Sequence, residues 1–384
     1  MFTTRPALAG ALVGLLATLT GANPIAPVES SVGSPLSPPF HGPPFDGFYL
    51  NCTAEDSCVE WKWFNIMAPL NEDNTPPAAI QVLMYTGYAF GPKQPGAPEF
   101  YVTIDGFYPN GTAFEVVLPA SEFQVENAGN YVVGTWKDVG SYTTYANLST
   151  TVVEIDTPQV SGSFRIDSRG QHHFGCNTTS TPYFNSAKPE NPSNLENTFY
   201  NQLGWATTIP GGNAVADLKI NGVDFQFSGP GYHDANWFPE FLNDAITEWF
   251  FGSASTEEYD FSYTLVYFIN STHVFDTGYL SRNGVVLQNQ CNTDKTKTDI
   301  TVLTPWGSGV SADGAAIPAG YILQYFLANG EEYQFNLTAF GQQPDLPVYH
   351  RFIGSATGGK VGEEPQVGGS VFEWLNPGLQ IYTP

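Results

Sequence analysis

A two-residue loop in the middle of the chain, Asn221-Gly222, constrains the fold more than any other sequence feature. The segments on its two sides, 216–220 and 223–227, follow a β-strand pattern, and Asn-Gly between two such segments is the strongest short-range signal for a β-hairpin. The same dipeptide recurs at Asn110-Gly111, Asn283-Gly284 and Asn329-Gly330. Long hairpins at regular spacing predict an all-β, antiparallel fold, and the pattern leaves barrel and sandwich both open.

The strand pattern fills both halves of the chain. Residues 48–177 form a first β-domain in this interpretation, and residues 201–384 form a second. The segment between them, 178–200, is rich in turn-forming residues and almost free of apolar periodicity, which predicts a linker. One short helix is expected at 239–250, where apolar residues recur at helical spacing and would pack into the core.

The first residues have the features of a secretory signal peptide. A basic residue, Arg5, precedes an apolar run at 8–19, and small residues follow at 20–22, so we expect cleavage after residue 22. The run is shorter than the roughly 20 residues that a helix needs to span a bilayer. Residues 23–47 are rich in Pro, Ser and Gly and are expected to form an extended, poorly ordered arm.

Export would explain two further features. Four cysteines in an oxidising compartment predict two disulfides, and Cys52 with Cys58 is the favoured local pair, which leaves Cys176 and Cys291. Six Asn-x-Ser/Thr sequons are candidate glycosylation sites, and each one used must lie on the surface. They are Asn51, Asn110, Asn147, Asn177, Asn270 and Asn336. We therefore expect a protein that is secreted or resides in the lumen of the secretory pathway.

The charge balance limits the possible partners. The chain has 37 acidic and 13 basic residues, a net charge of −24. Nucleic acids and anionic membranes are bound through basic surfaces, so neither is an expected partner, and no membrane insertion is expected. A barrel can hold a small apolar ligand in its mouth, so a hydrophobic small molecule is the expected partner. The sequence does not indicate the oligomeric state.

The densest group of chemically active side chains follows the Asn221-Gly222 hairpin. Residues 229–237 contain Tyr232, His233, Asp234, Asn236 and Trp237. Such a cluster forms either a buried hydrogen-bond network that closes a barrel or the lining of a pocket. In the second case Tyr232, His233 and Asp234 are catalytic candidates, while Asn236 and Trp237 would contact the substrate.

A second candidate group lies at 60–64, where Glu60, Trp61, Lys62 and Trp63 alternate along one expected strand. Alternate residues of a strand point to opposite faces, and the sequence does not say which set faces a pocket. If Lys62 faces inward, its ammonium is a catalytic donor to a substrate oxygen. If Trp61 and Trp63 face inward, they form pocket walls; ordinary barrel core is the alternative for both sets.

Together the two groups resemble a known family. Trp205, Pro210-Gly211-Gly212, the Asn221-Gly222 hairpin and the 231–237 motif resemble the signature of hydroxyneurosporene-synthase-like proteins, and 60–64 is similar to their Glu-Trp-Trp-Tyr-Phe pattern. This resemblance covers residues 48–384. It implies two lipocalin-like barrels in tandem. The family includes bacterial carotenoid hydratases and fungal lipocalin-like Diels–Alderases, and the export features resemble the secreted hetero-Diels–Alderases of tropolone–sesquiterpene pathways.

The resemblance implies a pericyclase that joins a tropolone-derived o-quinone methide to a humulene-type olefin. Such a cycloaddition needs oriented reactants rather than a nucleophile or a redox group, so no cofactor and no metal are expected. Where the family often has His and Gly, this chain has Ala235 and Phe238, which disfavours water addition. Further substrate-binding candidates are Trp205, Trp306, Tyr325 and Trp374.

Two other functions remain open at this stage. A secreted lipocalin-like carrier would use the same kind of pocket without accelerating a reaction, because a pericyclase pocket is a binding pocket shaped for a transition state. A secreted sugar-active protein would suit the acidic, aromatic composition, although no carboxylate spacing marks a glycosidase pair.

Overall fold

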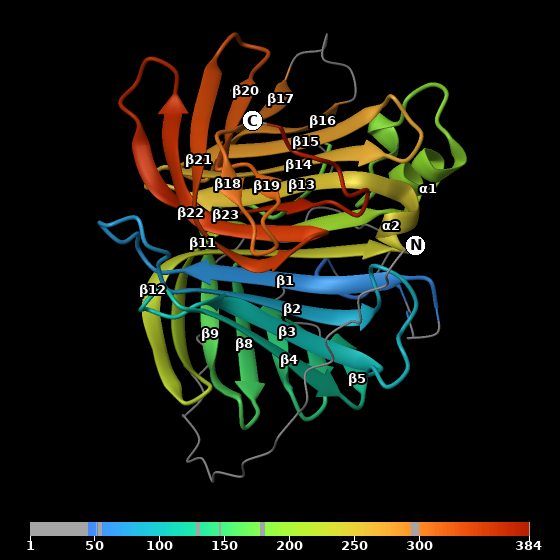
Figure 1. Cartoon of the computed structure of the whole chain (residues 1–384), viewed down its shortest axis with the longest axis vertical. Coiled ribbons are helices and arrows are strands. Elements are labelled where there is room, and N and C mark those ends of the chain that lie inside the picture. Colours follow the sequence, from blue (N-terminus) through green and yellow to red (C-terminus); the bar gives the residue numbers. More distant parts are fainter. Residues whose placement is uncertain are drawn as a thin grey trace.

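The structure is a computed structural model that describes residues 45–50, 52, 56–127, 131–145, 147–176, 181–292 and 299–383. The expected signal peptide, most of the expected arm, and the sequons at Asn51 and Asn177 lie outside the described residues. Two large antiparallel sheets account for most of the described chain, and each curves into a nearly closed barrel (Figure 1). No helix in the described ranges is long and apolar enough to cross a membrane.

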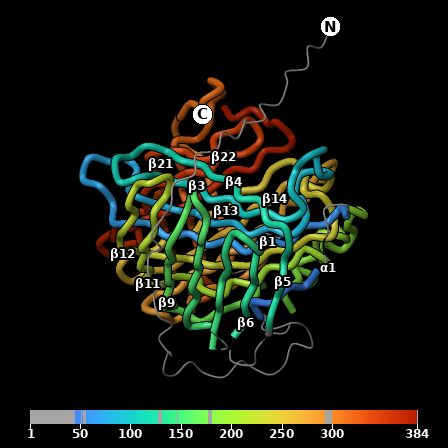
Figure 2. Tube along the Cα trace, turned by 90° about the horizontal axis from the view of Figure 1, so that it is seen from below, coloured from blue at the N-terminus to red at the C-terminus, as the bar shows by residue number. Residues whose placement is uncertain are grey.

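Barrel 1, built from the first sheet, has the strand order β4-β3-β2-β1-β12-β11-β9-β8-β7-β6-β5, with β10 paired to β11. Figure 2 shows β5, β6, β9 and β11 curving around this barrel. Its strands are β1 (Val59–Met67), β2 (Ala79–Gly87), β3 (Phe100–Phe107), β4 (Ala113–Ala120), β5 (Phe123–Asn127), β6 (Tyr131–Trp136), β7 (Gly140–Tyr145), β8 (Thr150–Asp156), β9 (Val160–Ser168), β10 (His173–Phe174), β11 (Gly204–Ile220) and β12 (Val223–Phe238).

Barrel 2, built from the second sheet, has the order β16-β15-β14-β13-β23-β22-β21-β20-β17. Its strands are β13 (Ile246–Ser255), β14 (Tyr259–Phe268), β15 (Val274–Arg282), β16 (Val285–Asn292), β17 (Ile300–Trp306), β20 (Gly320–Phe326), β21 (Glu332–Leu346), β22 (Tyr349–Lys360) and β23 (Gln366–Leu375). A small hairpin, β18 (Gly309–Val310) with β19 (Ala316–Ile317), adds a third sheet. The helical elements are η1 (Asn185–Ala187), α1 (Asn194–Gln202) and α2 (Leu242–Ala245).

The hairpin prediction is confirmed at the loop that joins β11 to β12. Asn221 and Gly222 have φ angles of 49° and 82°, as a tight two-residue turn with two left-handed positions requires. Ile220 pairs with Val223, so the two strands continue directly from the turn. The all-β fold with two barrels and a short helix is likewise confirmed.

Of the expected helix at 239–250, only residues 242–245 are helical. They form α2, and β13 starts at Ile246. Trp249 and Phe251 pack into the core between the barrels, whereas Phe250 packs into barrel 2. A strand buried on both faces has a continuous apolar run, and such a run cannot be distinguished from a buried helix by periodicity alone.

The two sheets do not separate at the expected linker. Strands β11 and β12 follow that segment yet belong to barrel 1, because β12 pairs with β1 and β11 pairs with β9. The chain therefore passes to barrel 2 at residues 239–245. The expected linker also contains most of α1, whose start is a capping box: Ser193 Oγ accepts from the Glu196 amide at 3.2 Å, and Glu196 accepts from the Ser193 amide at 2.6 Å.

The cysteines form two disulfides, which confirms the expected local pair. Cys52–Cys58 closes a short loop before β1, and Cys176–Cys291 ties the segment after β10 to β16 in barrel 2. Among the sequons that the structure describes, Asn110, Asn270 and Asn336 are exposed and Asn147 is half-buried. Their glycosylation stays a prediction.

Candidate functional site

Strand β1 separates two environments, which settles how residues 60–64 are oriented. Phe64 belongs to the core of barrel 1, and Glu60 and Lys62 on the same face of the strand are fully buried beside it. Trp61 and Trp63 point the other way, into the apolar cluster between the two barrels. The ammonium of Lys62 and the indoles therefore serve different sites.

Strand β12 divides its residues in the same way. The His233 ring stacks on Phe64 inside barrel 1 with ring centroids 4.1 Å apart, and Trp237 stacks on Tyr49 at 3.8 Å. Tyr232 belongs to the inter-barrel cluster, and Asp234 and Asn236 share its face of the strand. The candidate cluster at 229–237 is thus split between barrel 1 and the seam between the barrels.

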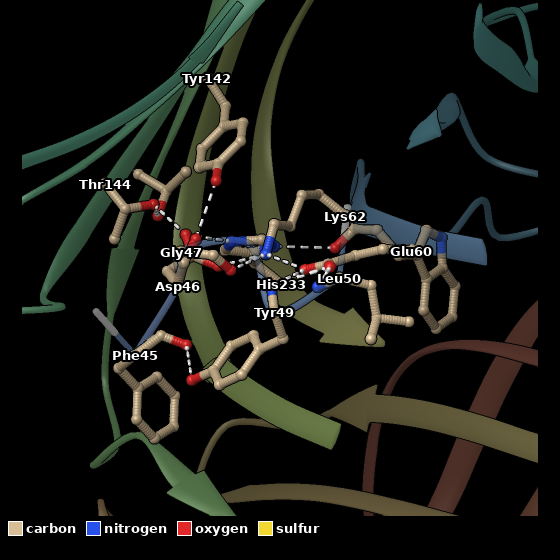
Figure 3. A network of polar contacts seen from close by, with 12 residues as sticks. Phe45, Asp46, Gly47, Tyr49, Leu50, Glu60, Lys62, Tyr142, Thr144 and His233 are labelled. Carbon is tan, nitrogen blue, oxygen red and sulfur yellow. Dashed lines mark hydrogen bonds and ion pairs between the residues drawn. The ribbon is translucent and has the colours of Figure 1, made fainter. Parts of the chain in front are cut away.

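A charged network fills the inside of barrel 1 (Figure 3). His233 Nε2 lies 2.9 Å from Asp46 Oδ2, and Lys62 Nζ lies 4.0 Å from Asp46 Oδ1 and 3.5 Å from Glu60 Oε1. All four side chains are fully buried. Lys62 Nζ also donates to the Gly47 carbonyl oxygen at 2.7 Å, and Thr144 donates to Asp46 Oδ2.

The two carboxyl groups of this network differ in acidity. His233 and Lys62 hold the pKa of Asp46 below its usual range although burial opposes them, whereas burial raises the pKa of Glu60 to about 7. His233 Nδ1 faces the Trp63 carbonyl oxygen at 3.0 Å. Because a carbonyl and an ionised carboxylate only accept hydrogen bonds, the geometry corresponds to an imidazolium that donates from both nitrogens.

The network holds residues 45–50 inside the barrel. Besides the contacts of Asp46 and Gly47, the amides of Tyr49 and Leu50 donate to Glu60 Oε2 at 2.9 and 2.8 Å. The expectation of a poorly ordered arm is therefore wrong for residues 45–47, because buried ionic partners fix that end of the arm. His233 takes part in this buried network, and its catalytic role stays a prediction.

Protonation of Glu60 gives a testable pH dependence of stability. At pH 5.5 the folded protein keeps a proton on Glu60 that the unfolded chain, with an ordinary pKa of 4.5, has largely released. This contribution to stability is therefore complete below pH 4.5 and is lost as the pH rises through about 7. We expect Glu60→Gln to remove a pH-dependent difference of roughly 2–3 kcal/mol between pH 5 and 8, measured by urea unfolding. An unchanged pH profile in this variant would contradict the assignment.

A pocket opens between the barrels, on the opposite face of β1 and β12. About 520 Å³ of empty space, part of it open to solvent, lies within it, and its walls are largely aromatic side chains. Trp63 packs edge-on against Phe251 at 4.8 Å, and Trp205 stacks on Trp249 at 5.5 Å. The lining residues are Trp61, Trp63, Leu83, Tyr85, Ala89, Phe90, Trp205, Asn236, Leu242, Trp249, Phe251, Tyr349, Arg351, Glu373 and Leu375.

The basic residue of the pocket lining is Arg351. Its Nη1 donates to both oxygens of Asp105 at 2.9 and 3.0 Å, and its Nε lies 3.5 Å from Glu373. The Arg351 guanidinium also contacts the Tyr349 hydroxyl and lies 5.6 Å from the centroid of the Trp63 ring. Burial raises the pKa of Asp105 to about 6 and raises that of Glu373, while the arginine stays charged.

Two neutral donors in the lining have no protein partner. Trp63 Nε1 and Asn236 Nδ2 are buried, and neither makes a hydrogen bond to any described part of the chain. A buried N–H without an acceptor costs about 1–3 kcal/mol, so such groups are rare and point to an absent acceptor such as water or a ligand oxygen. The pocket therefore combines two unpartnered hydrogen-bond donors with a cation and aromatic walls.

A buried carboxyl group with a raised pKa lies behind this pocket. Tyr232 donates to Asp234 Oδ2 at 2.7 Å, and burial raises the pKa of Asp234 well above its usual range. Asp234 Oδ1 has no hydrogen-bond partner among the described residues, and burial favours the uncharged form of the group.

The structure distributes the predicted site residues over three places. Trp61, Trp63, Trp205 and Asn236 line the pocket, and Tyr232 and Asp234 lie just behind it. Barrel 1 contains Glu60, Lys62, His233 and Trp237. Tyr325 and Trp374 belong to the core of barrel 2, and Trp306, on β17, donates to the Leu337 carbonyl oxygen in the same barrel.

Sequence reasoning missed Asp105, Tyr349, Arg351 and Glu373. They come from three strands, and Asp105 and Arg351 are 246 residues apart, so no local motif contains them. One signal was available. Arg351 and Glu373 are single charges inside otherwise apolar strand segments, where a charge is costly unless it is paired.

The fold and the pocket define a class: a double-barrel protein with an aromatic-walled pocket between its barrels. The family model for Diels-Alderase-like proteins matches residues 82–376, and the chain belongs to this family. It is 30% identical over 337 residues to the quinolone epoxide rearrangement protein penF of Penicillium thymicola, covering 83% of this chain and 84% of that protein. It is 24% identical over 315 residues to asqO of Emericella nidulans, a protein of the same description, covering 80% of each.

Solved structures support the fold. CghA superposes with a TM-score of 0.64 at 21% identity, over 83% of this chain and 88% of that one. Kievitone hydratase from Nectria haematococca gives a TM-score of 0.51 at 12% identity, over 90% and 97% of the two chains. At these identities the likeness shows a common fold.

Proposed function

We propose that this protein is an enzyme that binds an apolar, carbonyl-bearing substrate in the inter-barrel pocket and accelerates a pericyclic reaction. One observation supports the proposal: Trp63 and Asn236, which carry unpartnered donors, line the same aromatic-walled cavity as Arg351. Membership of the Diels-Alderase-like family supports the reaction class.

The pocket would act mainly by orientation. Holding two reacting groups in one geometry gives effective molarities of roughly 10⁵–10⁸ M, worth about 7–11 kcal/mol of the barrier. The indoles of Trp61, Trp63 and Trp205 supply flat apolar walls. Donors aimed at a carbonyl oxygen would stabilise the negative charge that grows there as a diene or heterodiene is polarised. Arg351 strengthens this field because it is buried and permanently charged.

The specific reaction that we propose is a hetero-Diels–Alder cycloaddition between a tropolone-derived o-quinone methide and a humulene-type sesquiterpene, in fungal secondary metabolism. The carbonyl oxygen of the quinone methide would accept from Trp63 and Asn236, and its flat ring would stack on the indoles. The olefin would fill the apolar remainder of the pocket. The neutral carboxyl of Asp234 would assist release of water from a hydroxymethyl precursor.

Acid-assisted rearrangement of an epoxide is the second candidate. The relatives penF and asqO carry the name quinolone epoxide rearrangement protein. A protonated Asp234 suits this chemistry, because opening an epoxide needs a proton on the leaving oxygen. A quinolone carbonyl would take the acceptor position at Trp63 and Asn236.

A product assay separates these functions from a carrier. The glycosylated protein is mixed either with a hydroxymethyl-tropolone precursor and a hydroxylated humulene or with a quinolone epoxide, and products are followed by chiral LC–MS against a control without protein. We expect faster formation of one stereoisomer with the first pair. Acceleration only of the quinolone epoxide would select the second candidate. Binding with unchanged rate and isomer ratio in both mixtures would identify a carrier.

Asn236→Leu tests the donor role directly. The substitution removes a donor with no partner in the described protein and keeps a similar volume, so we expect a loss of turnover of roughly 10²-fold with the melting temperature maintained. The matched control is Gln288→Leu, which removes a buried amide of barrel 2 that donates to Thr301 at 2.9 Å. We expect the control to lower stability and keep turnover. Full activity of Asn236→Leu would remove Asn236 from the site.

A further inference from the structure

Glu373 is the acidic residue in the lining of the inter-barrel pocket. It lies on β23, where its neighbours Phe372 and Trp374 belong to the core of barrel 2. Because alternate residues of a strand point to opposite faces, the Glu373 side chain is directed into the seam. Its register partners there are Phe251 on β13 and Arg351 on β22, which also line the pocket. Strand pairing on both sides therefore fixes a carboxyl group in the pocket wall.

The two oxygens of Glu373 differ in their contacts. The Tyr349 hydroxyl donates to Oε2, and Arg351 Nε lies 3.5 Å from the same atom. Oε1 has no hydrogen-bond partner within the described ranges, although the side chain is only 14% exposed. An ionised carboxylate only accepts hydrogen bonds, and each of its oxygens has two lone pairs. Oε1 therefore presents unused acceptor capacity to the pocket.

The charge balance around Arg351 disfavours an anionic ligand. Arg351 Nη1 already binds both oxygens of Asp105, and its Nε faces Glu373. One cation thus faces two carboxyl groups, so a carboxylate of the ligand would meet no excess positive charge and would lie beside Glu373. Like charges repel strongly where water screens them little. An ammonium group on the ligand would meet the same difficulty beside Arg351, which leaves a neutral ligand as the best fit.

The lining offers hydrogen-bonding groups of both kinds to such a ligand. Trp63 Nε1 and Asn236 Nδ2 are donors without a partner among the described residues, and Glu373 Oε1 is an acceptor. A ligand that satisfies all three needs an acceptor and a donor. A hydroxyl group is a neutral donor, and its hydrogen bond to a carboxylate is charge-assisted and therefore strong.

We propose that Glu373 is a specificity-determining residue that binds a hydroxyl group of the substrate through Oε1. The pocket then selects a neutral compound with a hydroxyl group in addition to the oxygen bound by Trp63 and Asn236, and it rejects carboxylates. This inference rests on the proposed function, which places the substrate in the inter-barrel pocket. A site that hydrogen-bonds a hydroxyl group discriminates against an analogue without it, because the protein group is then left unpaired.

Substituted acetophenones test the inference on the full chain at a mildly acidic pH, where phenols are uncharged. The 3- and 4-hydroxy compounds are compared with their 3- and 4-methyl analogues of similar shape, and dissociation constants are measured by ligand-observed NMR. We expect the hydroxy compound to bind about 10–100-fold more tightly at one or both positions. Apolar walls alone would favour the methyl group. The anion 4-acetylbenzoate should bind more weakly than unsubstituted acetophenone, and tighter binding of this anion would contradict the charge argument.

Glu373→Met removes the acceptor and keeps a side chain of similar length. We expect the preference for the hydroxy over the methyl compound to disappear in this variant, while acetophenone itself still binds. The matched control is Asp105→Asn, because Asp105 is the other carboxyl partner of Arg351 but does not line the pocket. This control should keep the hydroxy preference of the wild type.

The wild-type preference needs no variant to fold. Equal binding of hydroxy and methyl compounds to the wild type, or tighter binding of the methyl compounds, would overturn the role of Glu373. An equal loss of preference in Glu373→Met and Asp105→Asn would also overturn it, because the preference would then depend on Arg351 and not on Glu373 Oε1. Failure of every acetophenone to bind the wild type would instead contradict the proposed function, which places the substrate in this pocket.

Discussion

Replacing Arg351 with methionine is expected to lower the rate of product formation by roughly 10²–10³-fold, the largest effect on activity that we predict. The guanidinium is buried in the pocket and fixed by Asp105 and Glu373, so in the proposed complex its charge would act on a substrate oxygen with little screening by water. The product assay under saturating substrate gives the measurement.

A loss of activity in Arg351→Met could also follow from a loss of stability, because Asp105 and Glu373 would be left buried without their cation. Removing one partner of a buried pair typically costs about 3–5 kcal/mol. The double variant Arg351→Met with Asp105→Asn removes one of the two stranded carboxyl groups. We expect it to recover much of the melting temperature and none of the turnover. Recovery of turnover together with stability would show that Arg351 has a structural role only.

The largest effect on stability is expected from Asp46→Ala. It leaves the buried charges of Lys62 and His233 without their main counter-charge, with a predicted cost of about 3–5 kcal/mol in urea unfolding at pH 7. Because the pKa of Asp46 is lowered, its contribution is present above pH 3.8 and is lost as the pH falls further. Asp73→Asn, an exposed carboxylate bound to Thr75, should change stability by less than about 0.5 kcal/mol.

Asp46→Ala also separates two roles of the barrel 1 network. Asp46, Lys62 and His233 lie on the face of β1 and β12 that points away from the pocket. If they only anchor residues 45–50, Asp46→Ala should keep turnover within a few-fold of wild type at temperatures where it stays folded. A loss of several hundred-fold in the folded variant would show that Lys62 and His233 act in the reaction, as proposed from the sequence.

The sequence predicts the local structure of this protein well where local rules decide it. The Asn221-Gly222 turn needs two left-handed positions, which Asn and Gly adopt easily. The alternation at 60–64 likewise shows that Lys62 and the two indoles face opposite sides. It does not show which side is the pocket, because β1 is buried on both faces. The same double burial made β13 resemble a helix.

The strand order of barrel 1 and the contacts of Arg351 and Asp46 depend on pairing between distant segments. Strand β12 joins β1–β4 to the rest of barrel 1 by pairing with β1 across more than 160 residues, and no local signal marks this choice over the expected linker. Arg351 reaches Asp105 only because β22 of one barrel faces β3 of the other. Asp46 is drawn into barrel 1 by charges on β1 and β12, so a segment rich in Pro and Gly ends in a fixed position.

The indole N–H signals of the tryptophans test the central claim most directly. Trp63 Nε1 in the pocket and Trp237 Nε1 inside barrel 1 are both buried without a protein acceptor among the described residues. We would record ¹⁵N–¹H correlation spectra with and without 2-nonanone, assigning each indole by its Phe variant. A downfield shift of the Trp63 proton with an unchanged Trp237 proton is the predicted result. A shift of Trp237 with Trp63 unchanged would place the ligand inside barrel 1 and contradict the inter-barrel site.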